Sequence, residues 1–127
     1  MPVLEHSVEN IYRVLEHYSG LKDNWNGCSA FAPSTEAIKN ANNFWELILE
    51  KEIDLPSVYL EDDGEINFLW KNNNNVKYFE IGFLGAGFSC FAVDENEQET
   101  MIDSESYARE DVQCVLKILL PQVKAMF

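Results

Sequence analysis

The chain has 127 residues, and its 9 basic against 22 acidic side chains leave a formal net charge of −13 at pH 7. This length suits one domain with one core, and 46% hydrophobic residues argue against wholesale disorder. Because strong negative charge repels nucleic-acid phosphates and anionic lipid headgroups, we expect neither direct nucleic-acid binding nor membrane binding. The sequence therefore predicts a single globular domain over residues 1–127.

The N-terminal sequence and the cysteines indicate in which cellular compartment the protein is expected. The first residues, MPVLEHSVENIY, lack a basic segment followed by an apolar one, and the longest uncharged stretch, IGFLGAGFSCFAV, is shorter than the roughly 20 residues that span a bilayer. Cys28, Cys90 and Cys114 are odd in number and show no C-x-x-C spacing, which argues against a disulfide framework and a zinc ribbon. We therefore expect a cytoplasmic protein.

Two amphipathic helices are predicted in the first half of the chain. Over residues 7–19, apolar residues recur three and four positions apart, with Ser7 as N-cap and Gly20 at a left-handed stop. A second helix begins after Ser34 as N-cap and carries a wide apolar face. Pro56 follows and biases its predecessor away from helical geometry, so helical structure ends before it.

A tryptophan lies between these helices, in the turn NWNG. Asn26-Gly27 predicts a tight reversal of the chain. We expect the Trp25 ring to close one end of the core while its indole N–H bonds to a loop carbonyl; stacking on a ligand is the alternative. Phe31 and Pro33 are expected to form a hydrophobic staple at the start of the second helix.

Beyond Pro56 the apolar period changes to two, which predicts an antiparallel meander. SVYLE and INFLW flank DDGE in a first hairpin, with Gly64 at positive φ; VKYFEIGF and FSCFAV flank the turn LGAG, and ETMID adds a short edge strand. A last helix starts near Glu110, and Pro121 should kink or restart it. The predicted fold class is α+β: N-terminal helices, a four- to five-stranded antiparallel sheet and a C-terminal helix, with helices on one sheet face.

The sequence shows no constellation typical of an enzyme. His6 and His17 would lie about 16 Å apart along one helix, too far to share a metal. GFSCF lacks the strand-to-helix setting of a nucleophile elbow, and GFLGAG lacks the lysine and the following helix of a phosphate loop. Glu80 is expected at an exposed strand position beside Tyr78. We expect no catalytic residue and no cofactor.

The stretch DENEQETMIDSE partly matches a calcium-binding loop. Asp94, Asn96 and Glu105 occupy its first, third and twelfth positions. However, Glu99 stands at the sixth, where the sharp turn requires glycine, and a strand precedes the stretch in place of a helix. A solvated acidic loop explains the same residues, so we expect no metal site.

The acidic residues fall in two stretches. Residues 50–65 hold seven acids and one base, and residues 94–111 hold eight acids and one base, so the two stretches carry the entire net charge. Such a field steers basic protein surfaces toward itself. The candidate partner-binding residues are Glu61, Asp62, Asp63, Glu65, Asp94, Glu95, Glu97, Glu99, Asp103 and Glu105.

Three alternatives stay open. The charge could serve solubility only, in a structural domain without a partner. The protein could be an enzyme of an unrecognised type. The interface could lie on apolar strand faces around Trp70 and Phe91 in place of the acidic loops.

The turn and packing motifs resemble those of a group of small uncharacterised bacterial and prophage proteins. NWNG followed by APSTEAI is similar to the group's W-[DN]-G turn and A-x-S-P-E-A helix start, with Thr35 in place of proline. LPSVYLEDDGEINFLW is similar to its P-x-[IV]…D-G-x-[IV]-x-[FL]-x-W hairpin, so the resemblance covers about residues 15–93. It implies a bacterial or phage setting and carries over no catalytic residues.

The negative charge and the implied bacterial or phage setting together predict an acidic binding module that sequesters a basic protein surface. The expected partner is a nuclease or a nucleic-acid-binding complex, because these present cationic grooves. The expected mode of action is that of an antitoxin, an immunity protein or a phage-encoded inhibitor of a defence nuclease.

Overall fold

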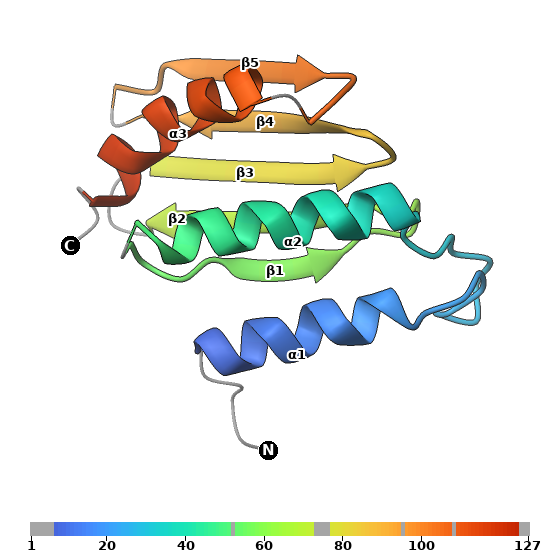
Figure 1. Cartoon of the computed structure of the whole chain (residues 1–127). Coiled ribbons are helices and arrows are strands. Elements are labelled where there is room, and N and C mark those ends of the chain that lie inside the picture. Colours follow the sequence, from blue (N-terminus) through green and yellow to red (C-terminus); the bar gives the residue numbers. More distant parts are fainter. Residues whose placement is uncertain (1–6, 52, 73–76, 95, 108, 125–127) are drawn as a thin grey trace.

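A computed structural model describes residues 7–51, 53–72, 77–94, 96–107 and 109–124. The elements follow in the order α1 (Val8–Ser19), α2 (Thr35–Leu49), β1 (Ser57–Leu60), β2 (Ile66–Asn72), β3 (Lys77–Leu84), β4 (Gly87–Val93), β5 (Glu99–Ser104) and α3 (Arg109–Lys124), as Figure 1 shows. Each strand pairs antiparallel with the next one in the chain, which gives the sheet order β1-β2-β3-β4-β5. The predicted α+β class and the meander are confirmed.

The helices begin where serine side chains can cap them. The Oγ atoms of Ser7 and Ser34 accept hydrogen bonds from the backbone N–H groups of Asn10 (3.1 Å) and Ala37 (3.0 Å), as expected. The left-handed stop predicted at Gly20 is wrong, because its φ is −97°. Its N–H instead donates to the His17 carbonyl at 3.1 Å, which tightens the last turn.

The third helix runs as one element from Arg109 to Lys124, through Pro121. A restart at Pro121 is therefore ruled out.

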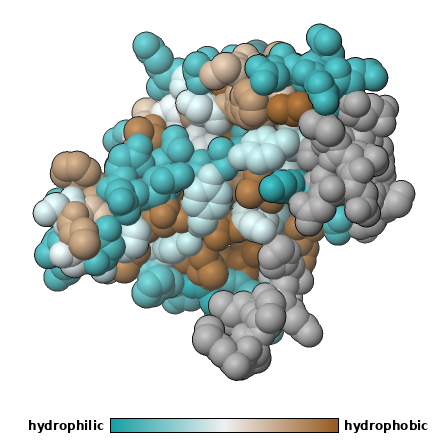
Figure 2. Space-filling view, turned by 180° about the vertical axis from the view of Figure 1, so that it is seen from behind, coloured by the Kyte–Doolittle hydropathy of each residue, from teal (hydrophilic) through white to brown (hydrophobic). Residues whose placement is uncertain are grey.

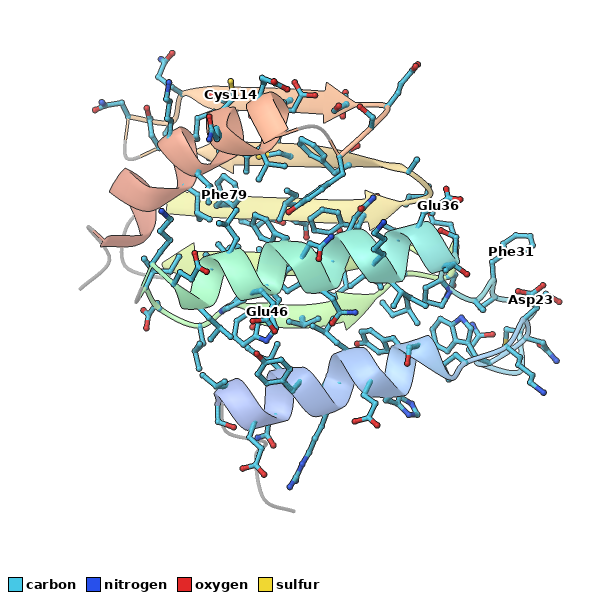
Figure 3. All side chains as sticks on the ribbon, viewed as in Figure 1. Asp23, Phe31, Glu36, Glu46, Phe79 and Cys114 are labelled. Carbon is cyan, nitrogen blue, oxygen red and sulfur yellow. The ribbon has the colours of Figure 1, made fainter. Side chains whose placement is uncertain are left out.

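The core lies between the sheet and the helices, which cover one face of the sheet (Figure 1). Phe44 of α2 packs against the rings of Phe68 and Phe83, with centroids 5.4 Å apart in both pairs. Figure 3 shows Phe79 in this layer. Alternate residues of the three inner strands are buried there: Ile66, Phe68, Trp70, Phe79, Ile81, Phe83, Phe88, Cys90 and Ala92.

Trp70 belongs to this core. Its side chain is 3% exposed, and its indole N–H donates to the Asp54 carbonyl at 2.8 Å. The hypothesis that a strand face around Trp70 forms an interface is therefore wrong for that residue, because the helices cover it.

The loop between α1 and α2 supports the β1–β2 turn. The Phe31 N–H donates to the Asp62 carbonyl at 2.8 Å, and Gly27 takes a φ of 76°, as the predicted reversal requires. The Trp25 indole N–H bonds to the Phe31 carbonyl at 2.7 Å, as expected. However, Trp25 is only half-buried and lies outside the hydrophobic core, so the expected closure of the core by its ring is wrong.

The predicted staple is wrong for Phe31, whereas Pro33 is buried. The Phe31 side chain is 62% exposed and projects away from the helices, as Figure 3 shows. Its backbone is anchored in both directions, at the N–H by Asp62 and at the carbonyl by Trp25, while its ring contributes little to the core. The loop therefore acts through its main chain.

Candidate protein-binding surface

The face of the sheet opposite the helices is uncovered in the part of the chain that the structure describes. Figure 2 looks at it and shows hydrophobic and intermediate residues lying between hydrophilic ones. We call this surface the open face. Strand alternation and the register place these residues on it: Ser57, Tyr59, Asn67, Leu69, Lys71, Tyr78, Glu80, Gly82, Leu84, Ser89, Phe91, Val93, Glu99, Met101 and Asp103.

A carboxylate flanked by two tyrosines lies at the centre of the open face. The Glu80 carboxylate accepts a hydrogen bond from the Tyr59 hydroxyl, and Tyr78 lies two residues before Glu80 on the same face of β3. Burial, together with the nearby Glu80 charge, raises the pKa of both phenols, so both stay protonated and Tyr59 keeps donating. Glu80 is half-buried, so the expected plain exposed position is wrong.

Apolar side chains continue this surface toward β5. Phe91 packs its ring edgewise against Tyr78, with centroids 5.9 Å apart. Met101 lies directly opposite Phe91 in the β4–β5 register, and its side chain is 70% exposed. The centre of the open face is therefore more apolar than the acidic ends of the sheet.

Beside this centre, small residues form the floor of an open cavity of about 510 Å³. In the register, Gly82 is opposite Asn67 on one side and Ser89 on the other, and Ser89 is opposite Asp103. The lining residues are Glu65, Gly82, Leu84, Ala86, Gly87, Phe88, Ser89, Asp103, Ser104 and Glu105. Three carboxylates thus meet around one hollow.

Gly82 allows the Glu65 side chain to reach this cavity. A Cβ atom at Gly82 would approach both the Asn67 Oδ1 and the Glu65 Cδ to 2.5 Å, closer than a Cβ atom comes to other heavy atoms in proteins. Asn67 is 2% exposed, and its amide N–H donates to the Glu65 carbonyl at 3.3 Å. Gly82 therefore leaves room for the Glu65 side chain over the sheet, and the buried amide anchors the Glu65 main chain.

The electrostatics of Glu65 reveal crowding of negative charge. Burial raises the pKa of its carboxyl, a hydrogen bond from Asn67 opposes that rise, and the charges of Asp63, Glu61 and Glu80 add to it. Like charges raise a carboxyl pKa because they disfavour its ionised form. A cation in the cavity would relieve this repulsion.

The fold sorts the candidate binding residues into two groups at opposite ends of the sheet. Because neighbouring strands are antiparallel, the β1–β2 turn lies at the same end as the last residue of β5 (Figure 1). We call the residues there the turn-end cluster: Glu61, Asp62, Asp63, Glu65, Asp103 and Glu105. The far-end group consists of Asp94, Glu97 and Glu99, about 20 Å away along the strands; Glu95 lies outside the described residues.

Some of these acids also shape their turns. The Asp63 Oδ1 accepts from the Glu65 N–H at 3.0 Å, and the Asp62 Oδ1 accepts from the Asn26 amide at 3.2 Å. The Asp94 Oδ1 accepts from the N–H groups of Asn96 and Gln98, both at 2.9 Å. Neutralising these aspartates would disturb local structure as well as charge.

The calcium-loop alternative fails on geometry. Asp94 precedes β5 and Glu105 follows it, so an extended strand separates the first and the twelfth position of the presumed loop. Within the described residues, no three His, Cys, Asp or Glu side chains are arranged to hold a metal ion.

Cys90 points into the core. Burial, with a smaller effect of the nearby Asp103, raises the pKa of its thiol to about 12, so the thiol stays protonated at neutral pH. It therefore cannot act as a thiolate nucleophile there.

Comparison with known proteins found no matching family model, no similar curated protein and no similar solved structure. As for the membrane, none of the helices within the described ranges combines the length and the apolar character that crossing a bilayer requires.

Proposed function

We propose that this protein is a binding module that sequesters a basic protein surface, in the manner of an antitoxin, an immunity protein or a phage-encoded anti-defence inhibitor. The observation that carries the proposal is the turn-end cluster, which draws acids from two separate stretches of sequence to one end of the sheet. The expected partner is a nuclease or nucleic-acid-binding complex, because its cationic groove complements this charge.

The described part of the chain provides no basic side chain that neutralises the cluster. Among the described side chains, no lysine or arginine forms an ion pair with the cluster, whereas Arg13 pairs with Glu9 on α1 at 2.9 Å. The carboxylates around Glu65 also repel one another, and a basic partner would reduce this repulsion when it binds. Both features favour association with a cationic surface.

Two charge-matched double variants test the proposal. Glu61→Gln with Glu105→Gln removes two charges from the turn-end cluster, and Glu97→Gln with Glu99→Gln removes two from the far-end group; none of the four side chains makes a hydrogen bond to the described backbone. A basic partner is first isolated on the immobilised protein from bacterial lysate at low salt. Its association rate is then measured with purified components by biolayer interferometry.

We expect the turn-end variant to slow association several-fold at about 0.05 M salt, and the far-end variant to retain the wild-type rate. Adding the protein in equimolar amount should also suppress the partner's nuclease or nucleic-acid-binding activity. Equal rates for both variants and wild type would mean that the charge serves solubility alone, and the proposal would be wrong.

A further inference from the structure

The turn-end cluster borders the open face, and the two surfaces share a cavity. Glu65, Asp103 and Glu105 line the cavity, and Ser89 on its floor is directly followed along β4 by Cys90 in the core and Phe91 on the open face. Phe91 and the exposed Met101 lie opposite each other in the neighbouring row. Charged and apolar groups therefore adjoin on one uncovered surface.

We infer that the open face, from its centre to the turn end and without the far end that carries Glu99, is the docking surface for the basic partner, and that an arginine or lysine side chain of that partner enters the cavity above Gly82. This inference rests on the proposed function and adds to it the place of contact. The cation lies among Glu65, Asp103 and Glu105, while apolar side chains of the partner cover Phe91 and Met101. The occupant is a protein, because the apolar row needs apolar contacts as well as charge.

A second copy of this chain does not suit the surface. Two copies meeting through their open faces would bring Glu65, Glu80 and Asp103 of each against the same carboxylates of the other or their neighbours. Such like-charge contact opposes association, and the net charge of −13 adds to the repulsion at longer range. Charge complementarity therefore selects a basic protein.

Tyrosine and arginine are common hot-spot residues in protein interfaces, where they contribute much of the binding energy. Here Tyr59 is already held by its hydrogen bond to Glu80, and the Tyr78 ring packs against Phe91, so both lose little side-chain freedom when a partner covers them. A cation in the cavity is partly screened from water by the walls, which strengthens its attraction to the carboxylates. One partner could therefore contact both the tyrosines at the centre of the open face and the acidic cavity beside them.

The test places a tethered cation in the cavity. Ser89→Arg puts a guanidinium opposite Asp103, and Ser19→Arg makes the same charge change at an exposed position of α1, on the helix side. We expect Ser89→Arg to raise Tm by about 2–5 °C, because the tethered cation relieves the repulsion among the carboxylates. Binding of the basic partner should weaken about tenfold with Ser89→Arg and stay near wild type with Ser19→Arg.

A named probe locates the contact independently of the partner. The 15N-labelled protein is titrated with an octa-arginine peptide, and separately with spermine, at about 0.05 M salt. Backbone amide shifts concentrated at Gly82, Gly87, Ser89 and Phe91 with the peptide support the inference. A larger response to spermine than to the peptide at these residues would identify a small polyamine as the ligand and overturn it.

Failure of this inference differs from failure of the proposed function. If Ser89→Arg and Ser19→Arg bind the partner equally, while Glu61→Gln with Glu105→Gln still slows association, the partner binds the turn-end cluster without the open face. The docking surface is then wrong and the proposed function stands. If neither charge neutralisation nor Ser89→Arg alters binding, both are wrong.

Discussion

At the residue scale, Glu65 has the most informative environment. Its pKa is raised in the folded protein, so the folded state binds its proton more tightly than the unfolded state does. The ionised carboxylate therefore opposes folding, and its effect grows as pH rises from the unfolded pKa through the folded one. We expect Glu65→Gln to be more stable than wild type at pH 7 and equally stable below about pH 4.

Urea denaturation at both pH values measures this difference. Glu16→Gln on α1 is the matched control, since it removes one exposed acid from a helix that carries no residue of the cluster. A Glu65→Gln protein that is less stable than wild type at pH 7 would show that the Asn67 hydrogen bond outweighs the burial and the repulsion.

Trp25 gives a second prediction at this scale. The Trp25→Phe variant keeps most of the half-buried ring but loses the hydrogen bond to the Phe31 carbonyl. We expect a loss of about 1 kcal/mol in the free energy of unfolding. Thermal or urea unfolding checks it, with Phe31→Ala as a control that keeps the backbone acceptor. A Trp25→Phe protein as stable as wild type would mean that water replaces the indole donor.

Several residue roles could be read from the sequence and others could not. The serine caps and the glycine turns follow from local chemistry, which depends on neighbours within four positions. The bond between Tyr59 and Glu80 joins different strands, and it requires the register of three strands to be known. The alternation of Tyr78, Glu80 and Gly82 was the available signal, because it places these residues on one face.

At the element scale, the β1–β2 turn depends on Gly64 for two reasons. Its φ is +92°, and a Cβ there would lie 2.8 Å from the Ala32 carbonyl oxygen. Gly85 in the β3–β4 turn also has positive φ, +61°, but a Cβ there would meet nothing within 4 Å. Substitution of Gly85 therefore tests backbone strain alone, whereas substitution of Gly64 tests strain together with steric overlap.

We expect Gly85→Ala to destabilise the protein by about 1–2 kcal/mol through strain alone. Gly64→Ala should cost about 3–4 kcal/mol, because it must also displace the loop that anchors the turn. Urea denaturation of both variants provides the comparison. Equal losses would show that the loop at Ala32 yields without cost.

The order of elements could be predicted because each has its own periodicity, and the change of period after Pro56 marks the boundary between helices and strands. The division of the acidic residues between the two ends of the sheet could not be predicted. Residues 94–111 form one acidic stretch in the sequence, but β5 runs through it and carries Asp103 and Glu105 to the end opposite Asp94. The spacing of charges along the sequence does not show at which end of the sheet each charged residue lies.

At the scale of the whole molecule, uncompensated charge should govern the response to salt. The net charge of −13 destabilises the compact state through self-repulsion, and this repulsion is screened as ionic strength rises. The screening length falls from about 30 Å at 0.01 M to about 3 Å at 1 M. We expect Tm to rise over this range of NaCl, and calorimetry measures it.

The variant Glu61→Gln with Glu105→Gln is the control for this effect. Because it begins with less repulsion, it should have a higher Tm at low salt and gain less from added salt. A Tm that falls with NaCl in wild type would mean that attractive ion pairs outweigh repulsion in the folded state.

The meander leaves β1 and β5 as the edges of the sheet, and these edges differ. β1 has four residues, whereas β5 has six and bears Glu99 and Asp103 on the open face. An unpaired strand edge is a template on which further strands can add, and acidic side chains beside it keep copies apart. Glu99→Gln with Asp103→Asn removes both charges from this edge. That variant should therefore turn β5 from a protected edge into a site of fibre growth, beginning from folded molecules.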